Sequence, residues 1–170
     1  MPPVRRISGQ DPSMDGHYGI QAMQVSTSRF GKVEIDQQRV VSFSKGILGF
    51  PHQKKYVLLQ PDVDSCFYWL QAIDREDLAF VVTDPSMFIP SYRVPIKTEQ
   101  MRELNLESLD KGQVFVIVNK NQNTLTGNLQ GPLVINAKQC VGEQLVLSNH
   151  RFTAREPLME LGAAAEMVSA

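Results

Sequence analysis

Three histidines and two cysteines are the residues of this 170-residue sequence that most readily take part in metal or nucleophilic chemistry. His17, His52 and His150 lie far apart, and no patterned set of carboxylates or cysteines accompanies any of them. Cys66 and Cys140 are isolated, so they predict neither a C-x-x-C pair nor a disulfide framework. An aromatic residue follows Cys66 directly, which favours a small core residue over a reactive thiol. We therefore predict no bound metal, no cofactor and no catalytic nucleophile.

Two further patterns that could do chemistry are typical of turns. Gly46-x-x-Gly49 lacks the Lys-Ser/Thr end of a phosphate-binding loop, and its glycines suit backbone with positive φ. The acidic cluster Asp74-Arg75-Glu76-Asp77 holds its own cation, which favours solvated turn residues over a catalytic carboxylate pair. We predict on these grounds that the protein is not an enzyme.

Composition restricts the class of protein and its partners. Hydrophobic residues make up 42% and charged residues 21%, as in an ordinary globular domain, and the length suits one domain. A formal charge of −1 does not supply the positive field that sequence-independent nucleic-acid binding needs, so we predict no direct nucleic-acid partner. Neither a secretory leader nor a run of 18 apolar residues is present. The prediction is a cytoplasmic protein with no membrane partner.

The elements that must position any site are mostly strands. Period-two apolar patterns bounded by Gly, Pro or Asp predict strands over residues 30–35, 40–43, 56–59, 67–72, 78–83, 114–118, 125–129, 133–136 and 144–147. The first two are expected to pair as a hairpin. Thr98–Leu106 is the best helical segment, with Thr98 as its N-cap. The spacing predicts a mainly β fold, an antiparallel closed or nearly closed β-barrel of about nine strands with one or two short helices.

The two ends differ in pattern from the rest of the chain. Residues 1–25 are rich in Pro, Gly, Ser and Gln without an apolar period, and we expect a flexible extension there. Residues 26–156 would form the barrel domain. Residues 157–170 form a tail whose apolar residues have near-helical spacing; this favours a frayed terminal helix over a partner-binding one.

Large apolar side chains in two loop-like segments suggest a binding surface. Met87–Tyr92 concentrates them beside two prolines, which exclude a central strand. Either these side chains cap the core, or they form an exposed groove for a partner helix. The Gly46–Pro51 loop poses the same alternative, because apolar loop residues are costly unless they are buried or used.

Four stretches in this order resemble one family. The stretches are Gly46–Phe50, Phe67–Ala72, Leu78–Pro85 and Gly127–Asn136, and the last places Leu133-Val134-Ile135 after Asn128. In that order and spacing they resemble the flagellar assembly factor FliW, over about residues 27–157. The chain differs from the family pattern at Leu48, where proline is usual, and at Pro51, where an acidic residue is common.

The resemblance implies a cytoplasmic chaperone that binds newly made flagellin. It also implies a partner switch, in which the free protein antagonises the carbon storage regulator, an RNA-binding translational repressor of flagellin messenger RNA. It implies a barrel fold without catalytic residues. Combined with the loop argument, it makes six residues candidates for partner binding: Phe50, Tyr68, Gln71, Phe88, Tyr92 and Asn128. For Asn128 and Asn136, structural amides remain the alternative. The alternative function is a small-ligand or nucleotide-binding β-barrel module, and an enzyme comes third.

Overall fold

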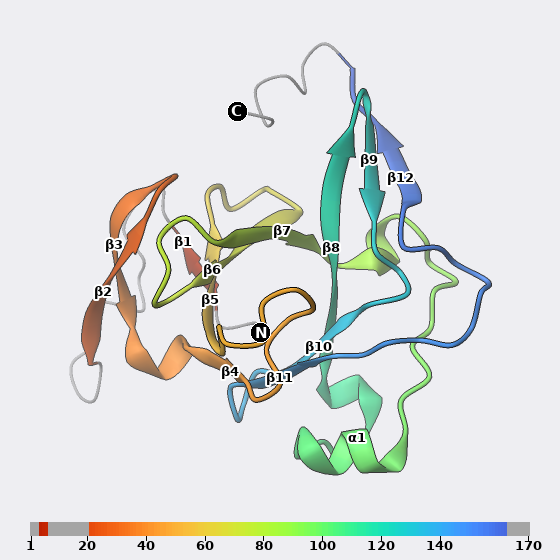
Figure 1. Ribbon diagram of the computed structural model, residues 1–170, viewed down its shortest axis with the longest axis horizontal. Helices are drawn as coiled ribbons and strands as arrows, with labels where there is room; N and C mark the ends of the chain where they lie inside the picture. The colour runs from red at the N-terminus through yellow and green to blue at the C-terminus, as the bar shows by residue number, and fades with distance from the viewer. Residues whose placement is uncertain (1–3, 7–20, 163–170) are drawn as a thin grey trace.

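Strands dominate the computed structural model, which describes residues 4–6 and 21–162 (Figure 1). The strands are β1 Val4–Arg6, β2 Ala22–Thr27, β3 Gly31–Asp36, β4 Val41–Phe43, β5 Lys55–Gln60, β6 Phe67–Ala72, β7 Ala79–Thr83, β8 Gln113–Asn121, β9 Thr124–Gly127, β10 Leu133–Asn136, β11 Val141–Gln144 and β12 Glu156–Glu160. The helical segments are α1 Thr98–Glu103 and the 3-10 turns Gln37–Arg39, Pro85–Met87 and Leu109–Lys111.

Seven of these strands close into a barrel, in the order β10-β11-β4-β5-β6-β7-β8, with β8 pairing back onto β10. Neighbouring strands are antiparallel except at one seam, where β11 runs parallel to β4. The predicted β-barrel is therefore confirmed, and "antiparallel" describes it approximately. Beyond the barrel, the far end of β8 forms a three-stranded arm with β9 and β12, which rises from the barrel in Figure 1.

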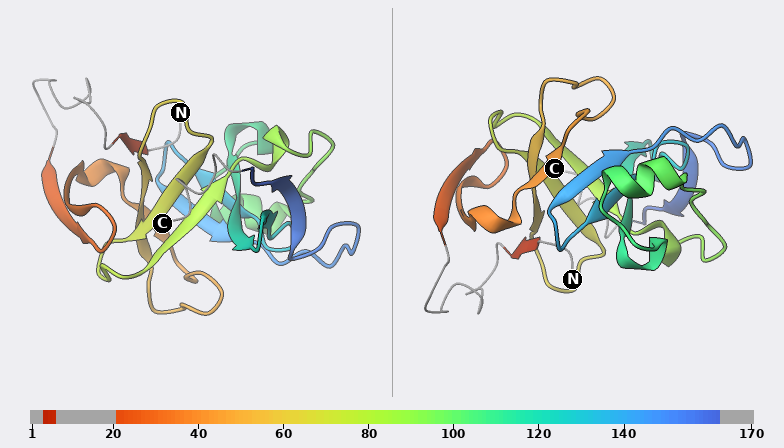
Figure 2. Two further views of the ribbon diagram at one scale, coloured as in Figure 1. Left: turned by 90° about the horizontal axis from the view of Figure 1, so that it is seen from above. Right: turned by 90° about the horizontal axis from the view of Figure 1, so that it is seen from below.

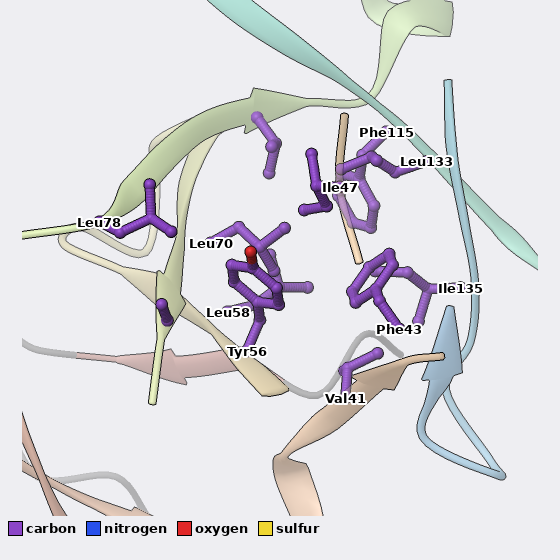
Figure 3. Close-up of a cluster of buried hydrophobic side chains, with 12 residues drawn as sticks. Val41, Phe43, Ile47, Tyr56, Leu58, Leu70, Leu78, Phe115, Leu133 and Ile135 are labelled. Carbon is purple, nitrogen blue, oxygen red and sulfur yellow. The ribbon is translucent and has the colours of Figure 1, made fainter. Parts of the chain in front are cut away.

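Side chains fill the barrel interior (Figure 3). The alternation of side chains along a strand sends Tyr68, Leu70 and Ala72 of β6 inward, where Leu70 and Ala72 are fully buried. The inward cluster consists of Val41, Phe43, Ile47, Tyr56, Leu58, Leu70, Ala72, Leu78, Val82, Phe115, Leu133 and Ile135. This interior is a packed core.

Tyr56 is the polar exception in this core. Its hydroxyl is buried without a hydrogen-bond partner among the described residues, while its ring packs edge-on against Phe43. A buried hydroxyl without a partner costs about 1–3 kcal/mol. We therefore expect Tyr56→Phe to leave the free energy of unfolding unchanged or raise it by about 1 kcal/mol, as measured by urea denaturation. A loss above about 1 kcal/mol would show that the hydroxyl has a partner.

A second layer covers the outside of β5. The β2–β3 hairpin lies beside the barrel at β5 (Figure 2). It packs Val25, Val33 and Ile35 against Val57 and Leu59, all of them buried. Strand β5 is therefore covered on both faces, which explains its unbroken apolar run better than a half-exposed strand would.

The hairpin pairing and the N-terminal boundary differ from expectation. Strand β3 pairs with β2, whereas β4 pairs with β5 and β11, so the predicted hairpin between residues 30–35 and 40–43 is wrong. Strand β2 starts inside the range expected to be a flexible extension, and so does β1, which pairs with β5. Strand β1 is held by backbone pairing. Its three residues are too few to show an apolar alternation in the sequence.

Local boundaries also shift near the C-terminus. Glu156–Glu160 forms β12 along β9, where near-helical apolar spacing had favoured a helix; residues 163–170 lie outside the described residues. The predicted strand at 144–147 is found at Val141–Gln144 instead. Leu145 and Leu147 lie beyond this strand, and their N–H groups donate to the carbonyls of Pro132 and Gln130 at 2.8 Å each.

The helix is shorter than expected and has a different cap. Lys97 occupies the N-cap position expected for Thr98, and its N–H donates to Gln100 Oε1 at 2.9 Å. The helix ends at Glu103, and Asn105 follows with a φ of 53°. Leu104, at the C-cap position, is nevertheless buried.

Candidate protein-binding site

A groove of about 430 Å³ lies where β7 ends and β8 begins. We call it the Met87 groove. It is lined by Tyr68, Asp84, Pro85, Ser86, Met87, Tyr92, Arg93, Val94, Leu109, Gly112, Gln113, Val114 and Phe115. The wall formed by residues 112–115 was not expected from the sequence, where these residues indicate only the start of a strand.

The sequence after β7 builds the rim of this groove. Asp84 Oδ1 accepts hydrogen bonds from the Ser86 N–H at 2.9 Å and the Ser86 hydroxyl at 2.7 Å. Pro85 is buried at the first position of the 3-10 turn, where its missing N–H is not needed. This cap turns the chain outward and leaves Met87 62% exposed. A flexible, polarisable thioether on a groove rim suits an adaptable protein contact.

Tyr92 lies below this rim and is only 5% exposed. Its hydroxyl donates to the carbonyl oxygen of Leu129 at 2.7 Å, and its ring packs edge-on against Phe152 at 5.4 Å. Both contacts tie the segment after η3, the 3-10 turn Pro85–Met87, to the core. The expectation that Tyr92 is exposed to a partner is therefore wrong, because its hydroxyl and ring are already used within the fold.

Burial of Tyr56 and Tyr92 makes stability depend on alkaline pH. Burial raises the pKa of both hydroxyls to about 12, from the ordinary value of about 10. The neutral hydroxyls stabilise the folded state fully below pH 10, and that contribution is lost as the pH rises through the folded pKa values. We expect the free energy of unfolding to fall between about pH 10 and 12, and to fall less in Tyr56→Phe. Urea denaturation at a series of pH values checks this; a flat profile would contradict it.

Tyr68 and Phe88 remain candidates for partner contact. Tyr68 is half-buried, lines the Met87 groove and packs edge-on against Phe115 at 5.7 Å. Phe88 is also half-buried, and its ring lies 6.0 Å from that of Phe67, outside the groove lining. Of the six candidates, Tyr68 and Tyr92 are thus brought together by the groove.

Phe50 belongs to the loop of residues 46–51, which we call the plug loop because its Ile47 enters the barrel core. Gly46 has a φ of 66°, and a Cβ there would lie 2.6 Å from the Phe50 carbonyl oxygen, so only glycine fits. The loop inserts Ile47 into the core and packs Phe50 edge-on against Phe80 at 5.6 Å. Leu48, at the tip of this loop, is 64% exposed. Core capping therefore accounts for most of this loop.

Gln71 is structural. It is 1% exposed, and its Nε2 donates to the carbonyl oxygens of Ala72 at 3.1 Å and Leu78 at 3.2 Å, as well as to two carbonyls of the intervening turn. The prediction that Gln71 contacts a partner is wrong, because its amide holds the β6–β7 turn. In that turn Arg75 and Asp77 form an exposed ion pair at 2.9 Å, as expected for solvated turn residues.

The two asparagines of the Gly127–Asn136 stretch hold backbone together. Asn128 Oδ1 accepts from the Gly131 N–H at 3.0 Å, so this half-buried amide closes a turn. Asn136 is buried, and its Nδ2 donates to the carbonyl of Leu104 at 2.8 Å, at the end of α1. The structural alternative accounts for both amides, although a partner contact by Asn128 stays a prediction.

Gln144 joins this stretch to the plug loop, whereas Lys45 joins the residue before that loop to α1 and β11, and neither was singled out from the sequence. Gln144 Nε2 donates to the Gly131 carbonyl at 3.0 Å, while its Oε1 accepts from the Leu48 N–H at 2.8 Å. Lys45 contacts Glu103 and Glu143 at 2.9 Å each. The hydrogen bond to Glu103, followed in strength by that to Glu143, holds the pKa of Lys45 well above its usual range. Such bridges appear only when distant segments meet in the fold.

Groups that could bind a metal do not gather in the part of the chain that the structure describes. No three His, Cys, Asp or Glu side chains of these residues lie close enough to hold an ion. Cys66 and Cys140 are half-buried free thiols. Among the same residues, no helix is long and apolar enough to cross a membrane. The arrangement offers apolar surface and hydrogen-bonding groups for a protein partner.

Comparison with known proteins places the sequence and the fold in one family. The sequence profile of the FliW protein family matches residues 24–158. The chain is 38% identical over 138 residues to the flagellar assembly factor FliW of Bdellovibrio bacteriovorus, covering 80% of this chain and 79% of that protein. It is 35% identical over 140 residues to that of Geotalea uraniireducens, covering 81% and 85%. A crystal structure of the flagellar assembly factor FliW superposes with a TM-score of 0.74 at 30% identity, over 81% of this chain and 97% of that one.

Proposed function

Since the chain belongs to the FliW family of flagellar assembly factors, we propose that it binds cytoplasmic flagellin as a chaperone, through the Met87 groove. The observation that carries the choice of site is the exposure of Met87, at 62%, on the rim of an apolar groove. An amphipathic helix lays its apolar face into a groove of this kind.

The shape of the fold supports a surface site over an interior one. Twelve buried side chains fill the barrel, and Ile47 enters it from the plug loop. A small-ligand or nucleotide-binding barrel needs an open interior with a few convergent polar groups. The packed interior therefore favours protein binding over that alternative.

The second part of the proposal is the partner switch. Free protein would bind the carbon storage regulator and relieve repression of flagellin messenger RNA, and flagellin would then displace the regulator. Such a switch requires that binding of one partner lower the affinity for the other, and the coupling must be reciprocal. With a formal charge of −1, the chain offers little long-range attraction for a basic regulator, so short-range contacts would carry the affinity.

Affinity capture from the native cytoplasm tests the proposed partners. We expect the immobilised full-length chain to retain flagellin, identified by mass spectrometry, and to release the carbon storage regulator when purified flagellin is added. Capture of the regulator unaffected by excess flagellin would contradict the switch. Retention of neither protein would contradict the proposed function.

A further inference from the structure

A second cleft lies apart from the Met87 groove and shares no lining residue with it. We call it the Trp69 cleft; its volume is about 200 Å³. One wall is the outer face of β6 and β7, where Trp69 and Val81 are direct cross-strand partners. The facing wall is the β8–β9–β12 arm, through Val118 and Leu125, with Leu161 just past β12. Figure 1 shows this arm leaving the barrel where β7 meets β8.

The cleft exists because β7 and β8 separate. Their pairing is confined to Val82 with Ile117 and Thr83 with Val116, whereas β8 continues to Asn121. From Val118 onward β8 pairs with β9 on one edge, and no described strand pairs with its edge toward β7. An unpaired strand edge presents N–H and C=O groups that can pair with another extended chain. The apolar lining therefore adjoins backbone that is able to add a strand.

Two cations lie at this cleft, and neither is paired with a carboxylate of the described residues. The Arg29 guanidinium, from the turn of the β2–β3 hairpin, lies 4.2 Å from the centre of the Trp69 ring. Lys120 is exposed, and neither it nor Arg29 forms an ion pair with a described carboxylate. Asp62 and Asp64 stand in the adjoining β5–β6 loop and are exposed, but neither contacts these cations as an ion pair. Among the described residues that line the cleft, Arg29 and Lys120 are charged and none is acidic.

We propose that the Trp69 cleft is a docking site for an extended segment of a partner protein that carries apolar side chains flanked by carboxylates. The segment pairs its backbone with the free edge of β8, as in recognition by strand addition. Its apolar side chains pack on Trp69, and its carboxylates meet Arg29 and Lys120. A guanidinium already placed on an aromatic face keeps its donors in a fixed plane, which suits a carboxylate. This site is additional to the proposed flagellin groove.

The tryptophan provides a direct readout, because the chain contains one Trp. The probe is the end-capped peptide Glu-Val-Phe-Val-Glu, and its matched control is Lys-Val-Phe-Val-Lys. We expect the acidic peptide to change Trp69 emission in a saturable manner and to bind the full chain at least about tenfold more tightly than the basic one. Equal binding of the two peptides, or no saturable change, would overturn the proposal.

Charge reversal identifies the groups that confer this preference. Arg29→Glu combined with Lys120→Glu should weaken the acidic peptide at least about tenfold, while Lys138→Glu, an exposed lysine outside the cleft, should not. Thermal melting confirms that each variant is folded. An unchanged affinity in the folded double variant would overturn the proposal.

The same peptide-binding measurement distinguishes a partner segment from two other possible occupants of the Trp69 cleft. If the chain forms a dimer that the double variant abolishes, the cleft belongs to a second copy, and the proposal fails. If the peptide binds only after removal of residues 163–170, the cleft belongs to that segment of the chain, and the proposal fails equally. Binding by the full-length monomer supports it.

Discussion

Replacing Met87 with aspartate is expected to weaken flagellin binding by about thirtyfold or more, which corresponds to about 2 kcal/mol. The side chain is 62% exposed on the rim of the Met87 groove, so the parent residue is available to an apolar partner surface. A carboxylate there would have to lose its water on binding against an apolar partner surface. Titration calorimetry with purified flagellin measures the change in affinity.

The control for this variant is Leu48→Asp. Leu48 is 64% exposed, close to the value for Met87, but it lies on the plug loop and does not line the groove. Both variants should melt near the parent temperature, because neither side chain belongs to the core. Equal affinity of Met87→Asp and the parent, or an equal loss in Leu48→Asp, would show that the groove is not the flagellin site.

Replacing Tyr92 with alanine is expected to destabilise the fold by about 3–5 kcal/mol, as for other buried aromatic residues. The change removes a ring packed against Phe152 and leaves the Leu129 carbonyl without its hydroxyl donor. For a chain of this size, the loss corresponds to a melting temperature lower by about 6 °C or more. Differential scanning calorimetry measures it.

Tyr92→Phe separates the two contributions. It keeps the ring and removes the hydrogen bond, so we expect a loss of about 1–2 kcal/mol. A parent-like melting temperature for Tyr92→Ala would show that Tyr92 does not support the fold. Because Tyr92 is structural, a double variant with Phe88 would confuse loss of folding with loss of binding, and Met87 is the better probe.

The barrel could be predicted from the sequence because its strands carry their own signal. Tyr56–Leu59 and Phe67–Ala72 are apolar runs bounded by turn residues, and both form strands within one residue or so of the expected bounds. Strand β1 could not be predicted, because its pairing with β5 uses backbone groups that every residue has. Strand β12 was missed because Leu158 and Leu161 fit helical spacing as well as extended chain.

The sequence predicted which segment borders the candidate site, but it did not predict which residues of that segment are exposed. Met87–Tyr92 does border a groove, but apolar loop residues look alike in sequence whether they cap a core or meet a partner. Only the structure separates exposed Met87 from buried Tyr92. Gln71 was misassigned for a related reason: an amide in a strand signals hydrogen bonding, and the turn that takes its donors becomes visible only in the fold.

Hydrogen exchange of the full-length chain, with and without saturating purified flagellin, tests the proposed function most directly. If flagellin occupies the Met87 groove, amides in residues 84–94 and 112–115 will exchange more slowly in the complex, while those of the β2–β3 hairpin will not change. Identical exchange throughout the chain at saturating flagellin would contradict the proposal that this assembly factor binds flagellin through that groove.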